Sequence, residues 1–237
     1  MISRVVYPAV VSEDKTLRLV VSGRSIARYG DGEFKMASHG AGIKSQQADA
    51  RLSERLRQIL QDSGECLVGI PNIRSDTPKA DFWGQHMKYG RLLNLNRQYV
   101  SSFITRPDSA PWINTAAFWT ELATLWVGRD VTLVRGSGKS FTGERLMAAG
   151  ARSVEEILAP RQHAWAEYEQ LLKRIGKPTR ALLCLGPTAT VMAVDLCRKG
   201  VHAIDLGHAG MFHKKYVTAE PMTVTDEEKA VDRVAVG

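Results

Sequence analysis

Two acidic residues, Asp31 and Glu33, stand one glycine apart within residues 25–34, and Gly30 precedes them. Two glycines within three residues suit neither the interior of a helix nor that of a strand, so we expect a tight turn. In such a turn an i, i+2 pair can aim both carboxylates at one point, where a cation or a shared proton must offset their repulsion. The spacing therefore favours a site for Mg²⁺ or Mn²⁺, which prefer carboxylate oxygen and leave positions open for phosphates.

Arg28 lies just before this acidic pair and is predicted to bind the same anion as the metal ion. The alternative is that the Asp-Gly-Glu sequence is only a solvated acidic turn. The apolar run before it, residues 17–21, is expected to begin the sheet.

A second candidate site follows the predicted strand 181–185. Gly186 comes after the strand, and two small hydroxylic residues, Thr188 and Thr190, open the next helix. Free backbone N–H groups and the helix dipole form an anion pocket at such a position, and either hydroxyl can donate to the anion. The sequence is not G-x-G-x-x-G and predicts no dinucleotide site. A threonine N-cap with an early proline explains the same residues without a ligand.

Asp205 ends the next predicted strand, where doubly wound sheets often hold a ribose-binding acid. His208 follows and is a candidate for catalysis or ligand contact, although a lone histidine is more often a loop or core residue. Ligands of open α/β sheets gather at the carboxyl ends of the strands. Parallel strands would therefore bring Asp31, Gly186 and Asp205 together.

The sequence Gly-Ser-Gly-Lys-Ser at residues 136–140 ends like a phosphate-binding P-loop. The full pattern requires a glycine at position 133, which is Leu133 here. We expect a basic loop that touches a phosphate or an acceptor. A phosphotransferase that acts through Lys139 is an alternative.

Strand and helix patterns alternate along the chain and predict an α/β fold with a doubly wound, mostly parallel sheet, in a single domain over residues 1–216. Helices are expected over 46–62, 78–98, 114–127, 144–149, 163–175 and 188–199. Strands are expected over 66–70, 99–104, 130–134, 181–185 and 201–206, with a weak strand or turn at 153–158. Residues 217–237 are a tail that forms an edge segment, a linker or a disordered end.

The tryptophans divide by their context. Core packing is the default for those in helical patterns, which include Trp83. Trp112 lies in a proline-rich loop and is the one that can stack on a sugar ring.

Composition sets limits on function. The chain has 237 residues, 44% hydrophobic and 24% charged, which is ordinary for a soluble globular protein. Its net charge of +7 suits an anionic small molecule or an acidic surface, and no signature of a nucleic-acid-binding module accompanies it. No apolar run reaches the roughly 18 residues of a membrane span, and the N-terminus lacks a signal-peptide core. Cys66, Cys184 and Cys197 predict reduced thiols in a cytoplasmic protein.

Residues 25–34 and 185–191 together resemble the glycosyltransferases of the GT-D fold. Weaker similarity continues in the same order through residues 46–60, 101–107, 157–168 and 195–208. The resemblance implies a Rossmann-like domain that uses a divalent metal and a nucleotide-sugar, usually UDP-linked, with Asp31 and Glu33 as its D-x-E metal motif. Residues 209–212 lack the acidic side chains that family members carry there, and Arg135 stands where they tend to have glutamate, which indicates a separate subfamily.

Together these residues predict a metal-dependent glycosyltransferase in which Asp31 and Glu33 bind Mn²⁺ or Mg²⁺. The phosphates or ribose of a UDP-sugar are expected to contact Arg28, Gly30, Gly186, Thr188 and Thr190. Asp205 or His208 is expected to act as the base or to bind the donor, and the acceptor to be a glycan or lipid-linked glycan. The alternative is a non-catalytic nucleotide- or glycan-binding module of a larger polysaccharide-assembly enzyme. A cytoplasmic location is expected, with a peripheral position at the inner membrane face left open.

Overall fold

The structure is a computed structural model that describes residues 5–78, 80–136 and 139–219. Eight strands of this part form one sheet in which all neighbours run parallel. They are β1 (Val10–Val11), β2 (Ile26–Arg28), β3 (Leu67–Ile70), β4 (Tyr99–Ser101), β5 (Asp130–Arg135), β6 (Ser153–Leu158), β7 (Arg180–Cys184) and β8 (His202–Asp205). Their order across the sheet is β1-β4-β3-β2-β8-β7-β5-β6. The predicted α/β fold with a parallel sheet is confirmed.

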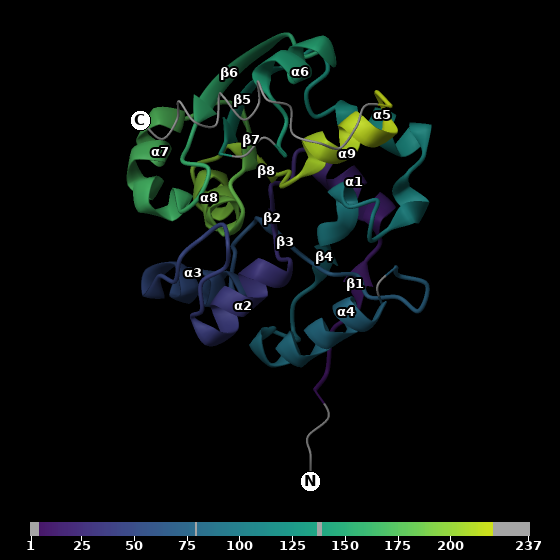
Figure 1. The fold of residues 1–237 in the computed structure, drawn as a ribbon, viewed down its shortest axis with the longest axis vertical. Helices are drawn as coiled ribbons and strands as arrows, with labels where there is room; N and C mark the ends of the chain where they lie inside the picture. Colours follow the sequence, from purple (N-terminus) through teal and green to yellow (C-terminus); the bar gives the residue numbers. More distant parts are fainter. Residues whose placement is uncertain (1–4, 79, 137–138, 220–237) are drawn as a thin grey trace.

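Helices cover both faces of the sheet (Figure 1). One hydrophobic cluster includes α2 (Asp31–His39), α3 (Ala50–Gln61), α7 (Tyr168–Ile175) and α8 (Pro187–Arg198). The other includes α1 (Glu13–Val21), α4 (Ala80–Gly84), α5 (Ala116–Ala123), α6 (Gly143–Ala148) and α9 (Ala209–Tyr216). Short 3₁₀ helices occupy Gln85–Leu92, Ser102–Thr105, Pro111–Ile113 and Ala164–Glu167.

Strand β7 shows how one short apolar sequence serves both clusters. Ala181 and Leu183 belong to the first cluster, and Leu182 and Cys184 belong to the second. Successive side chains of a strand point to opposite faces, so a strand covered by helices on both sides is apolar over these four successive positions.

The run at residues 17–21 is helical, and its prediction as a strand was wrong. It ends α1, whose first turn carries the acidic residues Glu13 and Asp14. Leu17 and Val20 are fully buried and lie three positions apart, which is the spacing of one helix face. A five-residue apolar run is too short to reveal this period.

Other differences concern element ends. The helical region predicted over 78–98 is α4 followed by a 3₁₀ helix that ends at Leu92, and the strand predicted over 99–104 stops at Ser101. The segment 153–158 is a full strand, paired with β5 at six positions. Residues 217–219 follow α9, and the rest of the predicted tail lies outside the described residues. Among the helices described, none combines the length and apolar character needed to cross a membrane.

The start of α9 packs against residues 140–141, which precede α6, so closely that it needs glycine at position 210. A Cβ atom there would lie 2.3 Å from the amide nitrogen of Phe141 and 2.4 Å from the carbonyl oxygen of Ser140. We expect Gly210→Ala to lower the free energy of unfolding by about 1–3 kcal/mol, because two backbone segments must separate. Chemical denaturation measures this change.

The matched control is Gly84→Ala in α4, where nothing lies within 4 Å of an added Cβ. This substitution should change the free energy of unfolding by less than about 1 kcal/mol. Equal losses in the two variants would contradict the close contact at α9.

Candidate functional site

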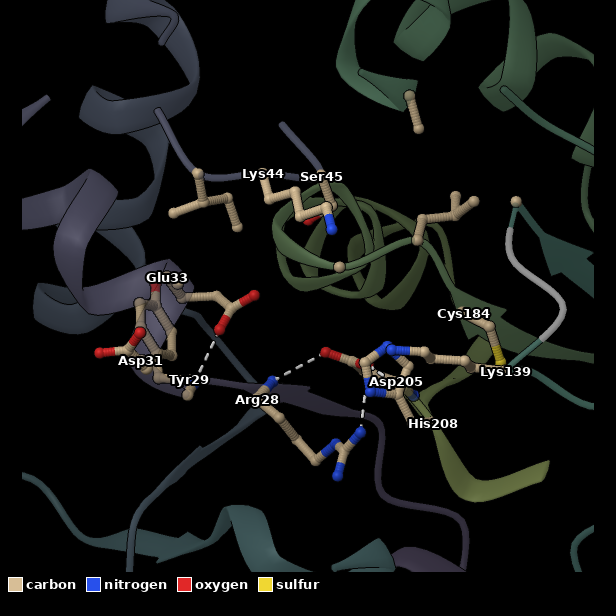
Figure 2. A pocket seen from close by; sticks show the side chains of 18 of the residues that line it. Arg28, Tyr29, Asp31, Glu33, Lys44, Ser45, Lys139, Cys184, Asp205 and His208 are labelled. Carbon is tan, nitrogen blue, oxygen red and sulfur yellow. Dashed lines mark hydrogen bonds and ion pairs between the residues drawn. The ribbon is translucent and has the colours of Figure 1, made fainter. Parts of the chain in front are cut away.

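The candidate site lies where β2 and β8 separate. These two strands are in register at a single pair, Ile26 with Ile204. Beyond this pair, the backbone N–H of Arg28 donates to the Asp205 side chain (N to Oδ2, 3.3 Å). The separation opens a cavity of about 700 Å³ at the carboxyl ends of the strands, where ligands of open parallel sheets bind (Figure 2).

Most of the predicted site residues line this one cavity. They are Arg28, Gly30, Asp31, Glu33, Gly186, Asp205 and His208. Thr188 and Thr190 are instead fully buried at the start of α8. The Thr190 hydroxyl donates to the carbonyl oxygen of Arg28 at 2.9 Å, so it supports the end of β2. The structure thus places neither hydroxyl on the cavity wall, where the sequence predicted both.

A buried ion pair joins β2 to β8. Arg28 Nη2 lies 3.5 Å from Asp205 Oδ1, and both side chains are more than nine-tenths buried. Arg28 Nη1 also donates to the carbonyl oxygen of Ser102 at 3.0 Å and to the Thr105 hydroxyl. Burial raises the pKa of Asp205, while the Arg28 charge opposes the rise. Removing either partner would leave an uncompensated buried charge.

Gly207 lets the chain pass beside this ion pair. Its φ of 53° is left-handed, and an added Cβ would lie 2.4 Å from Arg28 Nη2. Its N–H donates to Asp205 Oδ1 at 3.1 Å. Glycine is the residue that satisfies both the backbone angle and the close approach.

Asp31 and Glu33 begin α2 and do not form the predicted free turn. Gly30 is the N-cap, and its N–H donates to Glu33 Oε2 at 2.8 Å. Two carboxylates in the first helical turn are favourable because the N-terminal end of the helix dipole is positive. The glycines do not prevent the helix, because one caps it and the other lies in its first turn.

The two carboxylates diverge, which corrects the expectation that they aim at one point. Residues two apart in a helix differ by about 200° around its axis. Asp31 Oδ2 lies 2.7 Å from Lys35 Nζ, and its Oδ1 lies 3.3 Å from His86 Nε2. Figure 2 shows the Glu33 carboxylate turned toward Arg28, with that of Asp31 on the other side.

The side-chain pKa of Glu33 differs from the ordinary value of a glutamate. Burial raises its pKa to about 7; its backbone hydrogen bonds lower the pKa, and the nearby Asp205 carboxyl adds to the rise. The side chain lines the cavity, and a cation bound beside it would favour its ionised form.

His208 lines the cavity as a neutral imidazole. Burial, together with the positive charges of Arg106 and Lys139, lowers its pKa to about 4. It therefore has a free ring nitrogen lone pair at neutral pH. It can accept a hydrogen bond from a ligand hydroxyl.

Sequence reasoning missed several cations of the cavity wall. The positively charged residues that line it are Arg28, Lys35, Lys44, Arg106, Lys139 and Arg161, against the acids Asp31, Glu33 and Asp205. Lys139 belongs to the predicted basic loop, whose residues 137 and 138 lie outside the described residues. Arg106 could have been found, because it follows a predicted strand end. Lys44 and Arg161 lie in loops whose position depends on the fold.

Trp83 is buried in the second hydrophobic cluster, which confirms the expected core packing. Trp83 lines the cavity. Trp112 lies elsewhere, with its indole N–H donated to Glu13 Oε2 at 2.9 Å and the Arg74 guanidinium 4.3 Å from its ring centre. Of these two tryptophans, the core residue Trp83 is therefore the one at the cavity wall, and Trp112 is not.

The site can supply part of a divalent metal shell. Within the described residues, no three His, Cys, Asp or Glu side chains are grouped so as to hold an ion by themselves. Mg²⁺ and Mn²⁺ need fewer protein ligands, because water and phosphate oxygens complete their shells. Asp31 supplies carboxylate oxygen, and the neighbouring His86 Nε2 is buried with no hydrogen-bond partner among the described residues. This donor chemistry fits such an ion.

Residues 26–234 match the protein family described as Glycosyltransferase GT-D fold. The chain is 33% identical over 223 residues to "Probable glycosyl transferase Gly" of Streptococcus gordonii, and this match covers 84% of the chain and 32% of that protein. It is 32% identical over 213 residues to "Glycosyltransferase GlyD" of Streptococcus pneumoniae serotype 4, covering 82% of the chain and 26% of that protein. The chain therefore spans about a third and about a quarter of these curated relatives.

Solved structures share the fold. One is described as the highly conserved domain of unknown function 1792 with a distinct glycosyltransferase fold. It has a TM-score of 0.77 and 31% identity, covering 90% of this chain and 83% of that one. Another, described as a new glycosyltransferase from Streptococcus sanguinis, has a TM-score of 0.77 and 28% identity, covering 90% and 86%.

The environment of His208 predicts its titration. We expect its imidazole to stay neutral down to about pH 5, because burial and the cations Arg106, Lys139 and Arg28 disfavour the charged form. Lys139→Gln should raise the pKa of His208, since one of those cations is removed. NMR titration of the ring nitrogens measures both.

Lys177→Gln is the matched control, because it removes an equal charge from an exposed position after α7. It should leave the titration of His208 unchanged. A His208 ring that protonates near pH 6.5, the ordinary value, would contradict this environment.

Proposed function

Because the chain belongs to the family of glycosyltransferases with the GT-D fold, we propose that it transfers a sugar from a nucleotide-sugar to a glycan or glycoconjugate. The observation that carries the proposal is one cavity at the carboxyl ends of β2 and β8 whose wall combines six cations with three acids. The cations suit a diphosphate, and the acids suit a divalent ion and sugar hydroxyls.

The donor is a UDP-sugar in this proposal, as the resemblance of residues 25–34 and 185–191 implies. Its diphosphate contacts Lys44, Lys139 and the backbone at Gly186, where α8 begins. Helix N-termini with free N–H groups favour phosphate, and α8 has its N-terminus at the cavity wall.

We propose that the reaction depends on Mn²⁺ or Mg²⁺, bound by Asp31 with Glu33 on the same helical turn. When bound, the ion would offset the charge that builds on the departing diphosphate. The divergence of the two carboxylates means that Glu33 faces the cavity centre and Asp31 faces its edge.

Two further residues have separate roles in this proposal. Asp205 holds Arg28 in place through the buried ion pair, so it acts by positioning a cation. His208 accepts a hydrogen bond from a hydroxyl of the acceptor or donor, because its imidazole is neutral. Diphosphate anions entering the cavity would raise the pKa of His208 and make it a better base.

A second candidate function is a non-catalytic nucleotide- or glycan-binding module of a larger polysaccharide-assembly enzyme. The chain spans only 32% and 26% of two curated relatives, so its family occurs as one part of longer proteins. For the transferase the acceptor is a glycan or lipid-linked glycan, and for both candidates the site is cytoplasmic or peripheral to the inner membrane face.

Asp31→Ala and Glu33→Ala should each weaken UDP binding in the presence of Mn²⁺ by about 10- to 100-fold, a loss typical of damage to a metal site. EDTA should have the same effect on the unchanged protein. Isothermal titration calorimetry measures binding, and release of UDP from UDP-sugars measures turnover.

Glu65→Ala is the control, because its side chain is 94% exposed and away from the cavity. Unchanged UDP binding and turnover in both site variants would exclude the proposed mechanism. Metal-dependent UDP binding without turnover, across a panel of UDP-sugars and acceptors, would favour the binding module.

A further inference from the structure

His86 is a buried histidine beside the cavity that the sequence pattern did not single out. Its side chain is 3% exposed. The residue lies in the 3₁₀ helix that follows α4, and α4 forms part of the cavity wall. The rings of Phe82, Trp83 and Tyr89 pack around it, with centroids 5.2, 4.9 and 5.7 Å away. The burial of this imidazole calls for a structural or functional explanation, because histidine is less often fully buried than apolar residues are.

The hydrogen bonds of the ring determine which nitrogen carries the proton. His86 Nδ1 lies 3.1 Å from the carbonyl oxygen of Phe82. A carbonyl oxygen can only accept, so Nδ1 is the donor. In the neutral imidazole, Nε2 then carries a lone pair and no proton.

Nε2 faces a second acceptor. It lies 3.3 Å from Asp31 Oδ1, and it is buried without a hydrogen-bond partner among the described residues. A lone pair and a carboxylate oxygen at this distance repel unless a proton or a metal ion lies between them. The same carboxylate uses its other oxygen for Lys35, at 2.7 Å.

A proton on Nε2 would create a buried imidazolium. The side chain is 3% exposed and lies among three aromatic rings, and its Asp31 partner is itself partly exposed. Such surroundings favour the neutral ring, whose Nδ1 proton is held by Phe82. This leaves the lone pair on Nε2 available as a ligand.

The distance between the two atoms matches a pair of ligands on one ion. Ligand atoms about 2.1 Å from an octahedral ion and at right angles to each other lie about 3.0 Å apart. Metal-binding histidines commonly donate their other ring N–H to a backbone carbonyl, which fixes the tautomer. His86 shows this arrangement, with Phe82 as the carbonyl partner.

We propose that His86 Nε2 and Asp31 Oδ1 are the two protein ligands of a divalent cation at the edge of the cavity. This rests on the proposed function, since water and the donor's phosphate oxygens complete the shell. Of the two acids that the proposed function assigns to the ion, only Asp31 then binds it directly, and Glu33 lies on the other side of the helix turn, toward Arg28. The D-x-E motif is divided between two tasks.

The first test observes the ring without changing it. In ¹H–¹⁵N spectra of the metal-free protein at neutral pH, His86 should show a protonated Nδ1 and an unprotonated Nε2. Zn²⁺, a diamagnetic probe, should shift Nε2 strongly and leave Nδ1 protonated. A ring with both nitrogens protonated, unmoved by Zn²⁺, would overturn the proposal and establish an imidazolium–carboxylate pair.

The second test measures the affinity for Mn²⁺ by electron paramagnetic resonance of the free ion, with and without UDP. His86→Gln should weaken Mn²⁺ binding by at least about tenfold, as should Asp31→Asn. His39→Gln is the matched control, because His39 is exposed at the other end of α2. It should bind Mn²⁺ as the unchanged protein does.

The outcomes separate this inference from the proposed function. Mn²⁺-dependent UDP binding that survives His86→Gln but is lost in Asp31→Ala and Glu33→Ala would leave the function standing and exclude His86 as a ligand. A protein that binds no Mn²⁺, even with UDP, would overturn both the His86 site and the metal dependence. Thermal unfolding of His86→Gln identifies any loss of Mn²⁺ binding that is due to misfolding. If the variant is misfolded, the ring spectra of the unchanged protein decide whether His86 Nε2 binds the ion.

Discussion

The buried link between Arg28 and Asp205 is the interaction on which the cavity depends. β2 and β8 share a single register pair, so the strand ladder alone does not hold their carboxyl ends together. The Arg28 guanidinium and backbone N–H both reach Asp205, and Thr190 supports the Arg28 carbonyl from α8. These bonds satisfy the backbone N–H and C=O of Arg28 beyond the last register pair. Gly207 completes this arrangement, because any larger residue would displace the guanidinium.

The electrostatics of the cavity follow from this framework. Cations from several loops line a cavity whose wall also includes the acids Glu33 and Asp205. Burial raises the pKa of both acids. The cavity wall thus carries more positive than negative groups, six cations against three acids. Burial, together with the positive charges of Arg106 and Lys139, lowers the pKa of His208 to about 4. The chemistry of the site is therefore a property of the whole set of charges and belongs to no single residue.

The sequence predicted the fold class well, because alternating strand and helix patterns leave few ways to bury apolar faces. It also predicted that Asp31, Gly186 and Asp205 lie at one edge of a parallel sheet, although it placed the strand before Asp31 at residues 17–21 and missed β2. It failed where a local pattern was short or ambiguous. Residues 17–21 belong to an amphipathic helix whose period shows only when the acidic turn before it is included. The glycines at 30 and 32 indicated a turn, but Gly30 caps a helix that the Glu33 side chain stabilises.

The sequence by itself determined the parallel α/β architecture and the stretches that reach its functional edge, because both follow from local periodicity and from residue types that are costly to bury. Only the tertiary structure decided how the side chains are used. The helical geometry of α2 turns Asp31 and Glu33 apart, and packing from distant segments brings His86 to Asp31, Trp83 to the cavity and Thr190 to the Arg28 backbone. These contacts join residues far apart in the chain, and no spacing along the sequence records which side chains will meet across the core.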